Sequence, residues 1–269
     1  MCKGGCGNKP AIWISSGAHP REKISPAVGT YLLDELVEYN DAHPDLTEKL
    51  DWYFLLVHNP DGYRYSMGGC SRKNRSNKDQ GGDTCNGGCE TSVGVDLERN
   101  FNYLWTPSSD TCSLTYPGKS VSSEIETRNV EEFILARKDR IKLYISLHSY
   151  SQFILLPTGD DGDDRWRAVK MLADKATMKL DDYRILTMGE FAEEHYEVKG
   201  DSMQWAYHTV GKPYAYYIEL PPKQGNGNGF NLPRWEIQSA AEEVWDWHEV
   251  AAQHIIEEFS SSEGGKIQL

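Results

Sequence analysis

Two β-type runs that each lead to a metal-binding side chain constrain this chain more than any other feature. The apolar run 11–14 is followed by small residues and then by His19 and Glu22. The run 141–147 leads directly into His148. A zinc ion used in catalysis typically takes three imidazole or carboxylate ligands and keeps one position for water. We therefore predict that two strand ends converge on one zinc ion bound by His19, Glu22 and His148.

The His-x-x-Glu pair is a weak signal by itself, because most such pairs are solvated surface residues or contain a histidine packed in the core. Five further motifs give it weight, and they follow in a fixed order at 59–63, 72–75, 94–101, 147–152 and 217–220. Together with His19 and Glu22 they resemble the zinc metallocarboxypeptidases of the carboxypeptidase A/B type. The resemblance begins at about residue 10 and implies a catalytic domain that lacks its N-terminal part.

Strand-type and helix-type runs alternate along the chain, with strands expected at 11–14, 52–57, 141–147 and 214–220 and helices at 25–37, 122–137, 166–176 and 234–259. This alternation predicts an α/β fold, a mixed, mostly parallel twisted sheet with helices on both faces in three αβα layers. The site is expected at the carboxyl ends of the strands, where His19, His148 and Glu219 lie. Segment 59–62 is predicted to be a turn in which Pro60 fixes one dihedral and Gly62 permits a positive φ.

The composition fits one large domain and argues against some partners. A chain of 269 residues with 39% hydrophobic content can bury one substantial core, so we expect a single domain over 1–269 with a disulfide-containing loop at about 66–93. The net charge of −13, without a long basic stretch, argues against nucleic acid as a partner. No apolar run is long enough to span a membrane.

Six cysteines, all in the first half of the chain, indicate the compartment. They lie in glycine-rich or polar segments, which favours disulfide bonds and predicts a secreted, extracellular protein. A second zinc site is the alternative, but the close pair Cys85 and Cys89 is matched only by the distant Cys2 and Cys6. The family resemblance implies a disulfide from Cys112 to Cys89 or Cys85. It also implies a signal peptide and a pro-segment that are not present in this chain.

Glu219 is the candidate general base. A carboxylate beside the metal can take a proton from water and return it to the leaving amine, as amide cleavage requires. The resemblance places the catalytic glutamate in this strand. It also implies that Arg72 stabilises the oxyanion. By the same resemblance Arg99 binds the terminal carboxylate of the substrate, a task for which a planar guanidinium is suited.

The remaining substrate contacts follow from the same resemblance. Tyr196 resembles the mobile tyrosine that closes over the substrate, and Arg21 and Phe230 resemble flanking subsite residues. Met203 falls where relatives that select basic termini carry an aspartate and those that select apolar termini carry an apolar residue. An apolar terminal residue is therefore expected to be favoured, while Asp201, two positions away, keeps a basic or mixed preference open.

Glu98 departs from the family pattern Asp-x-Asn-Arg-Asn, in which the first asparagine assists the arginine on the terminal carboxylate. A carboxylate at this position is expected to compete with the substrate for Arg99 and to attenuate activity. The alternative is that neighbouring charge keeps Glu98 protonated, so that it donates a hydrogen bond as asparagine would. The first case predicts that Glu98→Asn raises kcat/KM at neutral pH.

The sequence thus predicts a zinc-dependent carboxypeptidase, a monomeric hydrolase that cleaves the C-terminal peptide bond of peptides and proteins. One alternative is a relative that retains zinc and binds peptides but is catalytically weak or inactive, which Glu98 and the missing N-terminal region favour. The other is a zinc deacylase of similar fold that acts on a small N-acyl amino acid. The motifs at 72–75 and 147–152 argue against the deacylase.

Overall fold

The computed structural model describes residues 9–38, 41–66, 70–76, 85, 93–225 and 229–260. Its strands are β1 Ala11–Ser16, β2 Asp51–Leu55, β3 Ile141–Ser149, β4 Phe153–Leu156, β5 Arg184–Thr187 and β6 Tyr214–Leu220. The longer helices are α1 Ile24–Glu38, α4 Ile125–Leu135, α5 Asp164–Thr177 and α8 Ile237–Phe259. The shorter elements are α2 Pro44–Glu48, α3 Pro60–Tyr65, α6 Met188–Glu194, α7 Ser202–Thr209 and the 3-10 turns η2 Leu97–Arg99 and η3 Arg234–Glu236.

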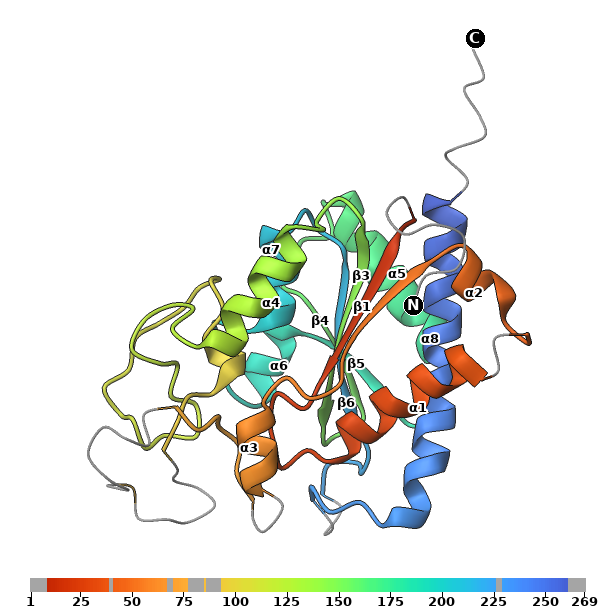
Figure 1. The fold of residues 1–269 in the computed structure, drawn as a ribbon. Helices are drawn as coiled ribbons and strands as arrows, with labels where there is room; N and C mark the ends of the chain where they lie inside the picture. Colours follow the sequence, from red (N-terminus) through yellow and green to blue (C-terminus); the bar gives the residue numbers. More distant parts are fainter. Residues whose placement is uncertain are drawn as a thin grey trace.

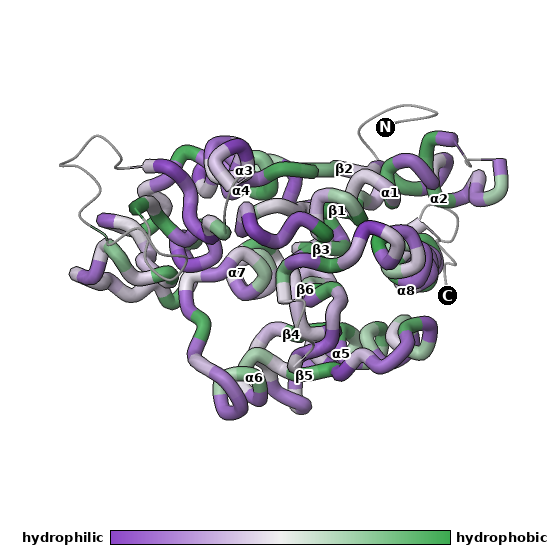
Figure 2. The backbone as a smooth tube through the Cα atoms, turned by 90° about the horizontal axis from the view of Figure 1, so that it is seen from below, coloured by the Kyte–Doolittle hydropathy of each residue, from purple (hydrophilic) through white to green (hydrophobic). Residues whose placement is uncertain are grey.

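The strands form one six-stranded sheet in the order β2-β1-β3-β6-β4-β5. Neighbouring strands are parallel except β4 and β6, which run antiparallel. Helices cover both faces: α1, α2, α5 and α8 lie on one side of the sheet and α3, α4, α6 and α7 on the other (Figures 1 and 2). The predicted fold class, a mixed and mostly parallel sheet in three layers, is confirmed.

The central strands β1, β3 and β6 are apolar on both faces because helices cover them on both sides. Every residue of β1 is buried, and in β6 only Glu219 is partly exposed. Since the three strands are parallel, their carboxyl ends meet at one edge, where β3 and β6 are paired so that His148 lies opposite Glu219. The sheet therefore delivers residues from distant parts of the sequence to one place.

The layer of α1 and α8 shows how the helical pattern positions the core. Buried α8 residues recur at spacings of three and four, including Val244, Trp247, Ala251 and Ile255, and α1 buries Val28, Leu32 and Leu36. These faces join a single hydrophobic cluster that includes the strands β1, β3 and β6. Among the described helices, none combines the length and apolar character that crossing a bilayer requires.

The expected elements agree with the structure apart from their ends and several omissions. The strand expected at 52–57 spans Asp51–Leu55, and the helix expected at 234–259 begins as the 3-10 turn η3 before α8. The omitted elements are short, namely β4, β5, α2, α6 and α7. Their brief runs contain too few turns or alternations to stand out in a sequence pattern.

The turn predicted at 59–62 is wrong. Segment 59–62 is the start of helix α3, and the Asn59 side chain accepts a hydrogen bond from the Gly62 amide at 3.0 Å. Gly62 is not among the described glycines with positive φ. Its small size is what matters, because a Cβ there would lie 2.5 Å from Cγ of Pro20 and 2.6 Å from Oδ1 of Asn59. Proline at the first helical position and asparagine as the cap favour a helix start over an isolated turn.

One predicted disulfide is confirmed within the loop region. Cys112 is bonded to Cys85, with 5.4 Å between their Cα atoms. This bond removes Cys85 as a thiolate ligand and so argues against a second zinc site built on it. Cys2, Cys6 and Cys89, and most of the predicted loop 66–93, lie outside the described residues. The ammonium group of Lys73 also anchors this region, because it donates to the carbonyl oxygens of Thr111 and Ser113.

Candidate metal centre and active site

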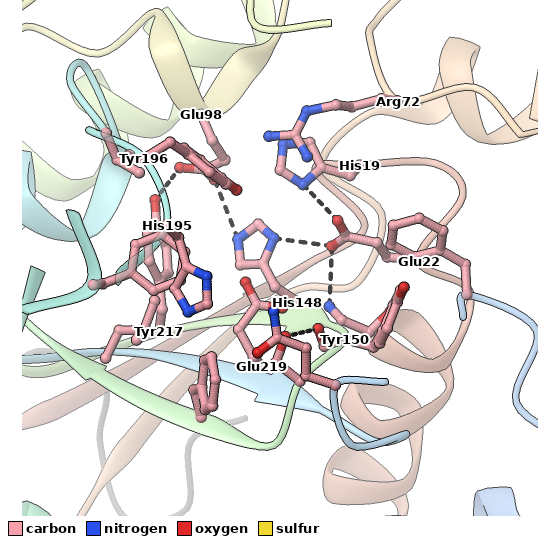
Figure 3. Close-up of a pocket in the computed structure, with 18 of the residues that line it drawn as sticks. His19, Glu22, Arg72, Glu98, His148, Tyr150, His195, Tyr196, Tyr217 and Glu219 are labelled. Atoms are coloured by element: carbon pink, nitrogen blue, oxygen red, sulfur yellow. Dashed lines mark hydrogen bonds and ion pairs between the residues drawn. The ribbon is translucent and has the colours of Figure 1, made fainter. Parts of the chain in front are cut away.

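The three predicted metal ligands converge at the carboxyl edge of the sheet (Figure 3). Nδ1 of His19 lies 2.8 Å from Oε1 of Glu22, and Nδ1 of His148 lies 3.0 Å from Oε2. One ligand atom from each residue lies within 4.8 Å of the other two, and all three residues are buried. Two imidazole nitrogens and one carboxylate are a donor set that zinc favours, so the residues present fit a zinc ion.

The other ring nitrogen of each histidine is occupied, which orients the ring. Nε2 of His19 is 2.9 Å from Oδ1 of Asp96, and Nε2 of His148 is 2.9 Å from the Ser146 hydroxyl. An acceptor on Nε2 keeps the proton there and leaves Nδ1 of His19 free to bind a metal. Asp96 had no role assigned from the sequence, although it lies in the motif at 94–101 and the structure places it behind a metal ligand.

Asp96 also orients Arg72, since its Oδ2 accepts hydrogen bonds from Nε at 3.0 Å and Nη2 at 2.9 Å. Burial opposes ionisation of Asp96, but the charges of Arg72, His19 and Arg99 hold the pKa of its carboxyl well below the usual range. Nη1 of Arg72 has no hydrogen bond within the described residues and Arg72 lines the pocket. Its guanidinium is thus fixed on one side and available on the other.

Protons and a metal would compete for this cluster. Burial disfavours a charged His148, but Glu22 and Glu98 raise its pKa well above the usual value. Burial also disfavours charge on Glu22, and the nearby His19 and His148 lower its pKa. The carboxylate therefore stays ionised while Nδ1 of His148 tends to hold a proton, which zinc must displace.

Glu219 projects from the end of β6 into the same pocket (Figure 3). Desolvation in the pocket and then the charge of Glu22 raise its pKa to about 7, against the lowering effect of His148, His19 and Arg72. A carboxylate with a pKa near neutrality can both accept and return a proton. Glu219 thus lies in the pocket with the metal ligands, and its role as a general base stays a prediction.

The predicted competition between Glu98 and the substrate for Arg99 does not agree with the structure. The Glu98 carboxylate accepts hydrogen bonds from the Ser202 amide at 2.9 Å and the Ser202 hydroxyl at 3.2 Å, and it also binds the Tyr217 hydroxyl. Arg99 instead donates from Nη1 to the backbone oxygen of Glu98 at 2.8 Å. The side chain of Glu98 therefore turns toward β6 and α7, and the geometry gives no reason for Glu98→Asn to raise kcat/KM.

The alternative of a protonated Glu98 also fails. Burial opposes its ionisation, but nearby His148 and the Tyr217 hydroxyl lower its pKa to about 2. Three donors that point at one carboxylate favour its charged form. Glu98 is thus an ionised acceptor in this structure.

All the predicted site residues except Met203 line one pocket, a cavity of about 180 Å³. The guanidinium of Arg21 lies 4.2 Å from the ring centre of Phe230, and Tyr196, 52% exposed, stands at the rim. Met203 is fully buried in α7 and does not line the pocket, so its predicted contact with the terminal residue does not agree with this geometry.

Gly200 allows the segment before α7 to reach Arg99. Its φ is +73°, and a Cβ there would lie 2.4 Å from the Arg99 backbone oxygen. The Phe101 amide donates to the Gly200 carbonyl at 2.9 Å, and the Gly200 amide donates to Tyr103 at 3.0 Å. Only glycine suits this close approach with positive φ, which places Tyr196 and Arg99 at the same pocket.

Comparison with known proteins agrees with this fold and shows the family. Residues 4–247 match the family model described as zinc carboxypeptidase. The chain is 36% identical over 248 residues to a zinc carboxypeptidase of Simulium vittatum, covering 88% of this chain and 78% of that protein. It is 34% identical over 266 residues to carboxypeptidase B of Astacus astacus, covering 96% of this chain and 84% of that protein. The chain belongs to the zinc carboxypeptidase family, and the predicted metallocarboxypeptidase is confirmed at the family level.

Solved structures show the same relationship. The crystal structure of thrombin-activatable fibrinolysis inhibitor superimposes with a TM-score of 0.83 at 30% identity, covering 96% of this chain and 65% of that one. Carboxypeptidase A from Helicoverpa armigera gives a TM-score of 0.81 at 27% identity, with 94% and 62% covered. Several relatives are longer: the chain spans 58% of carboxypeptidase B of Helicoverpa zea and 55% of zinc carboxypeptidase A 1 of Anopheles gambiae.

Proposed function

We propose that this chain is a zinc-dependent carboxypeptidase that removes the C-terminal residue of peptides and proteins. The observation that carries this proposal is the presence in one pocket of a zinc-type ligand set, a carboxylate with a raised pKa and a guanidinium suited to a substrate carboxylate. His19, Glu22 and His148 would hold one zinc ion. When bound, the ion would polarise the scissile carbonyl and activate a water molecule.

The protein residues then divide the remaining tasks. Arg99 binds the terminal carboxylate and fixes the substrate in register. Glu219 accepts the proton from water and passes it to the leaving amine. Nη1 of Arg72 faces the developing negative charge on the carbonyl oxygen, while Asp96 holds the rest of the guanidinium in place. Tyr196 at the rim covers the bound terminus, flanked by Arg21 and Phe230.

Other features support where and how it acts. The disulfide between Cys85 and Cys112 supports a secreted protein. The net charge of −13 supports peptides rather than nucleic acid as partners, and we propose that the protein acts as a monomer.

Blocked dipeptides with free or amidated C-termini test the proposal. We expect cleavage only of the free acids, because an amide cannot form a bidentate ion pair with Arg99. Glu219→Gln should lower turnover by about 100-fold or more and retain zinc, since it removes the proton acceptor. Glu242→Gln, an exposed position on α8, is the matched control and should keep full activity.

The outcomes separate the alternatives. Equal cleavage of free and amidated dipeptides would show that the terminal carboxylate is not recognised. Zinc content without hydrolysis of any substrate would favour the peptide-binding relative. Cleavage restricted to N-acyl amino acids would favour the deacylase.

A further inference from the structure

The pocket has a charged half and an apolar half. The charged half contains the metal ligands, Glu219 and the two arginines Arg72 and Arg99. The apolar half is lined by side chains from β4, α6 and the segment that follows α6, namely Phe153, Leu155, Met188, Phe191 and Val198. In the proposed binding mode the substrate carboxylate lies on Arg99 and the scissile bond lies beside Glu219. The C-terminal side chain of the substrate must then bind elsewhere in the pocket. The apolar half is where that side chain avoids desolvating the charged groups.

Tyr217 lines the same pocket and is held at both its ring and its hydroxyl. It lies two residues before Glu219 in β6, so both side chains project from the same face of the sheet. Its ring packs edge-on against His148, with 4.8 Å between the ring centres. Its hydroxyl donates to the Glu98 carboxylate and accepts from the Ser202 amide at 3.1 Å. Contacts at both the ring and the hydroxyl fix this side chain in one position.

The residues next to the Tyr217 hydroxyl are buried outside the pocket. Ser202 begins α7, and its neighbours Asp201 and Met203 are both fully buried. Neither lines the pocket, whereas Tyr217 does. The Tyr217 hydroxyl contacts Ser202, so the Tyr217 side chain extends from β6 to the start of α7, next to the segment that contains Asp201 and Met203.

We propose that Tyr217, held by Glu98 and Ser202, is the residue that limits the size of the C-terminal side chain, so that the enzyme selects small apolar termini such as glycine and alanine over bulky ones such as phenylalanine. The inference rests on the proposed carboxypeptidase function. It assigns Glu98 a positioning task in place of a contact with the substrate carboxylate. It also removes the buried Asp201 as a determinant of basic termini.

The test compares the zinc-loaded wild-type enzyme with three variants on blocked dipeptides that differ only in the terminal residue, glycine, alanine, leucine or phenylalanine. Tyr217→Ala should raise the ratio of kcat/KM for phenylalanine to that for alanine by about tenfold or more, mainly through KM, because the ring no longer occupies the space. Tyr217→Phe keeps the ring and should keep the wild-type ratio within about threefold. Tyr216→Phe is the matched control, because its hydroxyl binds the carbonyl oxygen of Val169 on the other face of β6.

Thermal unfolding and zinc content establish that each variant is folded. If Tyr217→Ala does not fold, Tyr217→Leu, which fills part of the space, should move the ratio in the same direction by a smaller factor. Wild-type cleavage of phenylalanine termini as fast as alanine termini would overturn the inference and leave the carboxypeptidase function intact. So would an unchanged ratio in a folded Tyr217→Ala or Tyr217→Leu enzyme. Absence of cleavage of every free-acid dipeptide would instead overturn the proposed function, and this inference with it.

Discussion

Buried polar groups occur both at the carboxyl edge of the sheet and in the layer of α8, and the groups named below differ in how many of their polar atoms have a partner. At the edge, Asp96 is paired with His19 and Arg72, and Glu98 accepts from Ser202 and Tyr217. In α8, His248 is 1% exposed; its Nδ1 donates to the Val244 carbonyl at 2.7 Å, and its Nε2 has no partner within the described residues. Networks make buried polar groups interdependent, whereas an isolated one lowers stability by itself.

The largest effect should follow from breaking the edge network at Asp96. We expect Asp96→Ala to lower the free energy of unfolding by about 3–5 kcal/mol, because it leaves Arg72 buried without its counter-charge. Zinc affinity should fall by about 10- to 100-fold, since His19 loses the acceptor that orients it. Denaturant unfolding and zinc titration measure the two quantities.

Asp51→Ala is the matched control for that experiment. Asp51 is a buried aspartate paired with Arg140 at the first residue of β2, away from the zinc ligands. It should lose stability and keep zinc affinity. Unchanged zinc affinity in Asp96→Ala would remove Asp96 from the metal centre.

Metal removal should have the next largest effect. A ligand present at 100 to 1,000 times its Kd stabilises the folded state by about 3–4 kcal/mol, so a strong chelator should lower the unfolding free energy by about that amount. Zinc in excess should restore it, and magnesium should not, because the site offers two imidazoles and one carboxylate. A thermal unfolding curve that is the same with and without chelator would contradict a bound zinc ion.

The isolated histidine predicts an acid-sensitive stability. Burial lowers the pKa of His248 to about 4, despite its bond to the Val244 carbonyl. The unfolded chain, with a His pKa near 6.5, therefore binds a proton first as the pH falls. The contribution of His248 to stability is full above about pH 6.5, falls by up to about 3 kcal/mol between pH 6.5 and 4, and changes no further below that range.

His248→Leu should flatten this part of the stability curve, as measured by denaturant unfolding from pH 4 to 7. His43→Leu is the matched control, because His43 is partly exposed and packs against Trp245 of α8, the helix that contains His248. An equal flattening in both variants would show that His248 is not the group responsible.

The smallest effect is expected for Glu98→Gln. The amide oxygen can still accept from Tyr217 or Ser202, so the loss of stability should be about 1 kcal/mol. Zinc affinity should stay within about threefold of the wild-type value, in contrast to Asp96→Ala, because Nε2 of His148 keeps its Ser146 partner. A loss of zinc affinity equal to that of Asp96→Ala would show that the two carboxylates have the same role.

The metal ligands were predictable because two strand-type runs lead to them and because the motifs that follow in a fixed order resemble one family. His148 follows a long apolar run and Glu219 ends another, and the carboxyl ends of parallel strands share one edge. The position of Tyr217 in the pocket could also have been predicted, since it lies two residues from Glu219 and must project from the same face. Asp96 carried none beyond its motif, because its role depends on contacts with His19 and Arg72 from other segments.

The errors come from side-chain neighbours that no local pattern encodes. Met203 was expected in the pocket, but it is fully buried in α7, and Tyr217, from a strand later in the sequence, lines the pocket instead. Glu98 was expected to face Arg99, but the Ser202 amide at the start of α7 offers a better donor. Gly62 was expected to permit a positive φ, but glycine is needed there because Pro20 leaves no room for a Cβ atom.

The pairing of β3 with β6 places the proposed base and the proposed selectivity residue on one strand, two positions apart. A substitution at Tyr217 can therefore alter which terminus is accepted while Glu219 stays where it is. An insertion or deletion of one residue in Tyr214–Leu220 would instead rotate both out of the cavity and present Ile218 there. During divergence of such enzymes, this strand can therefore accept substitutions, but it cannot accept insertions or deletions.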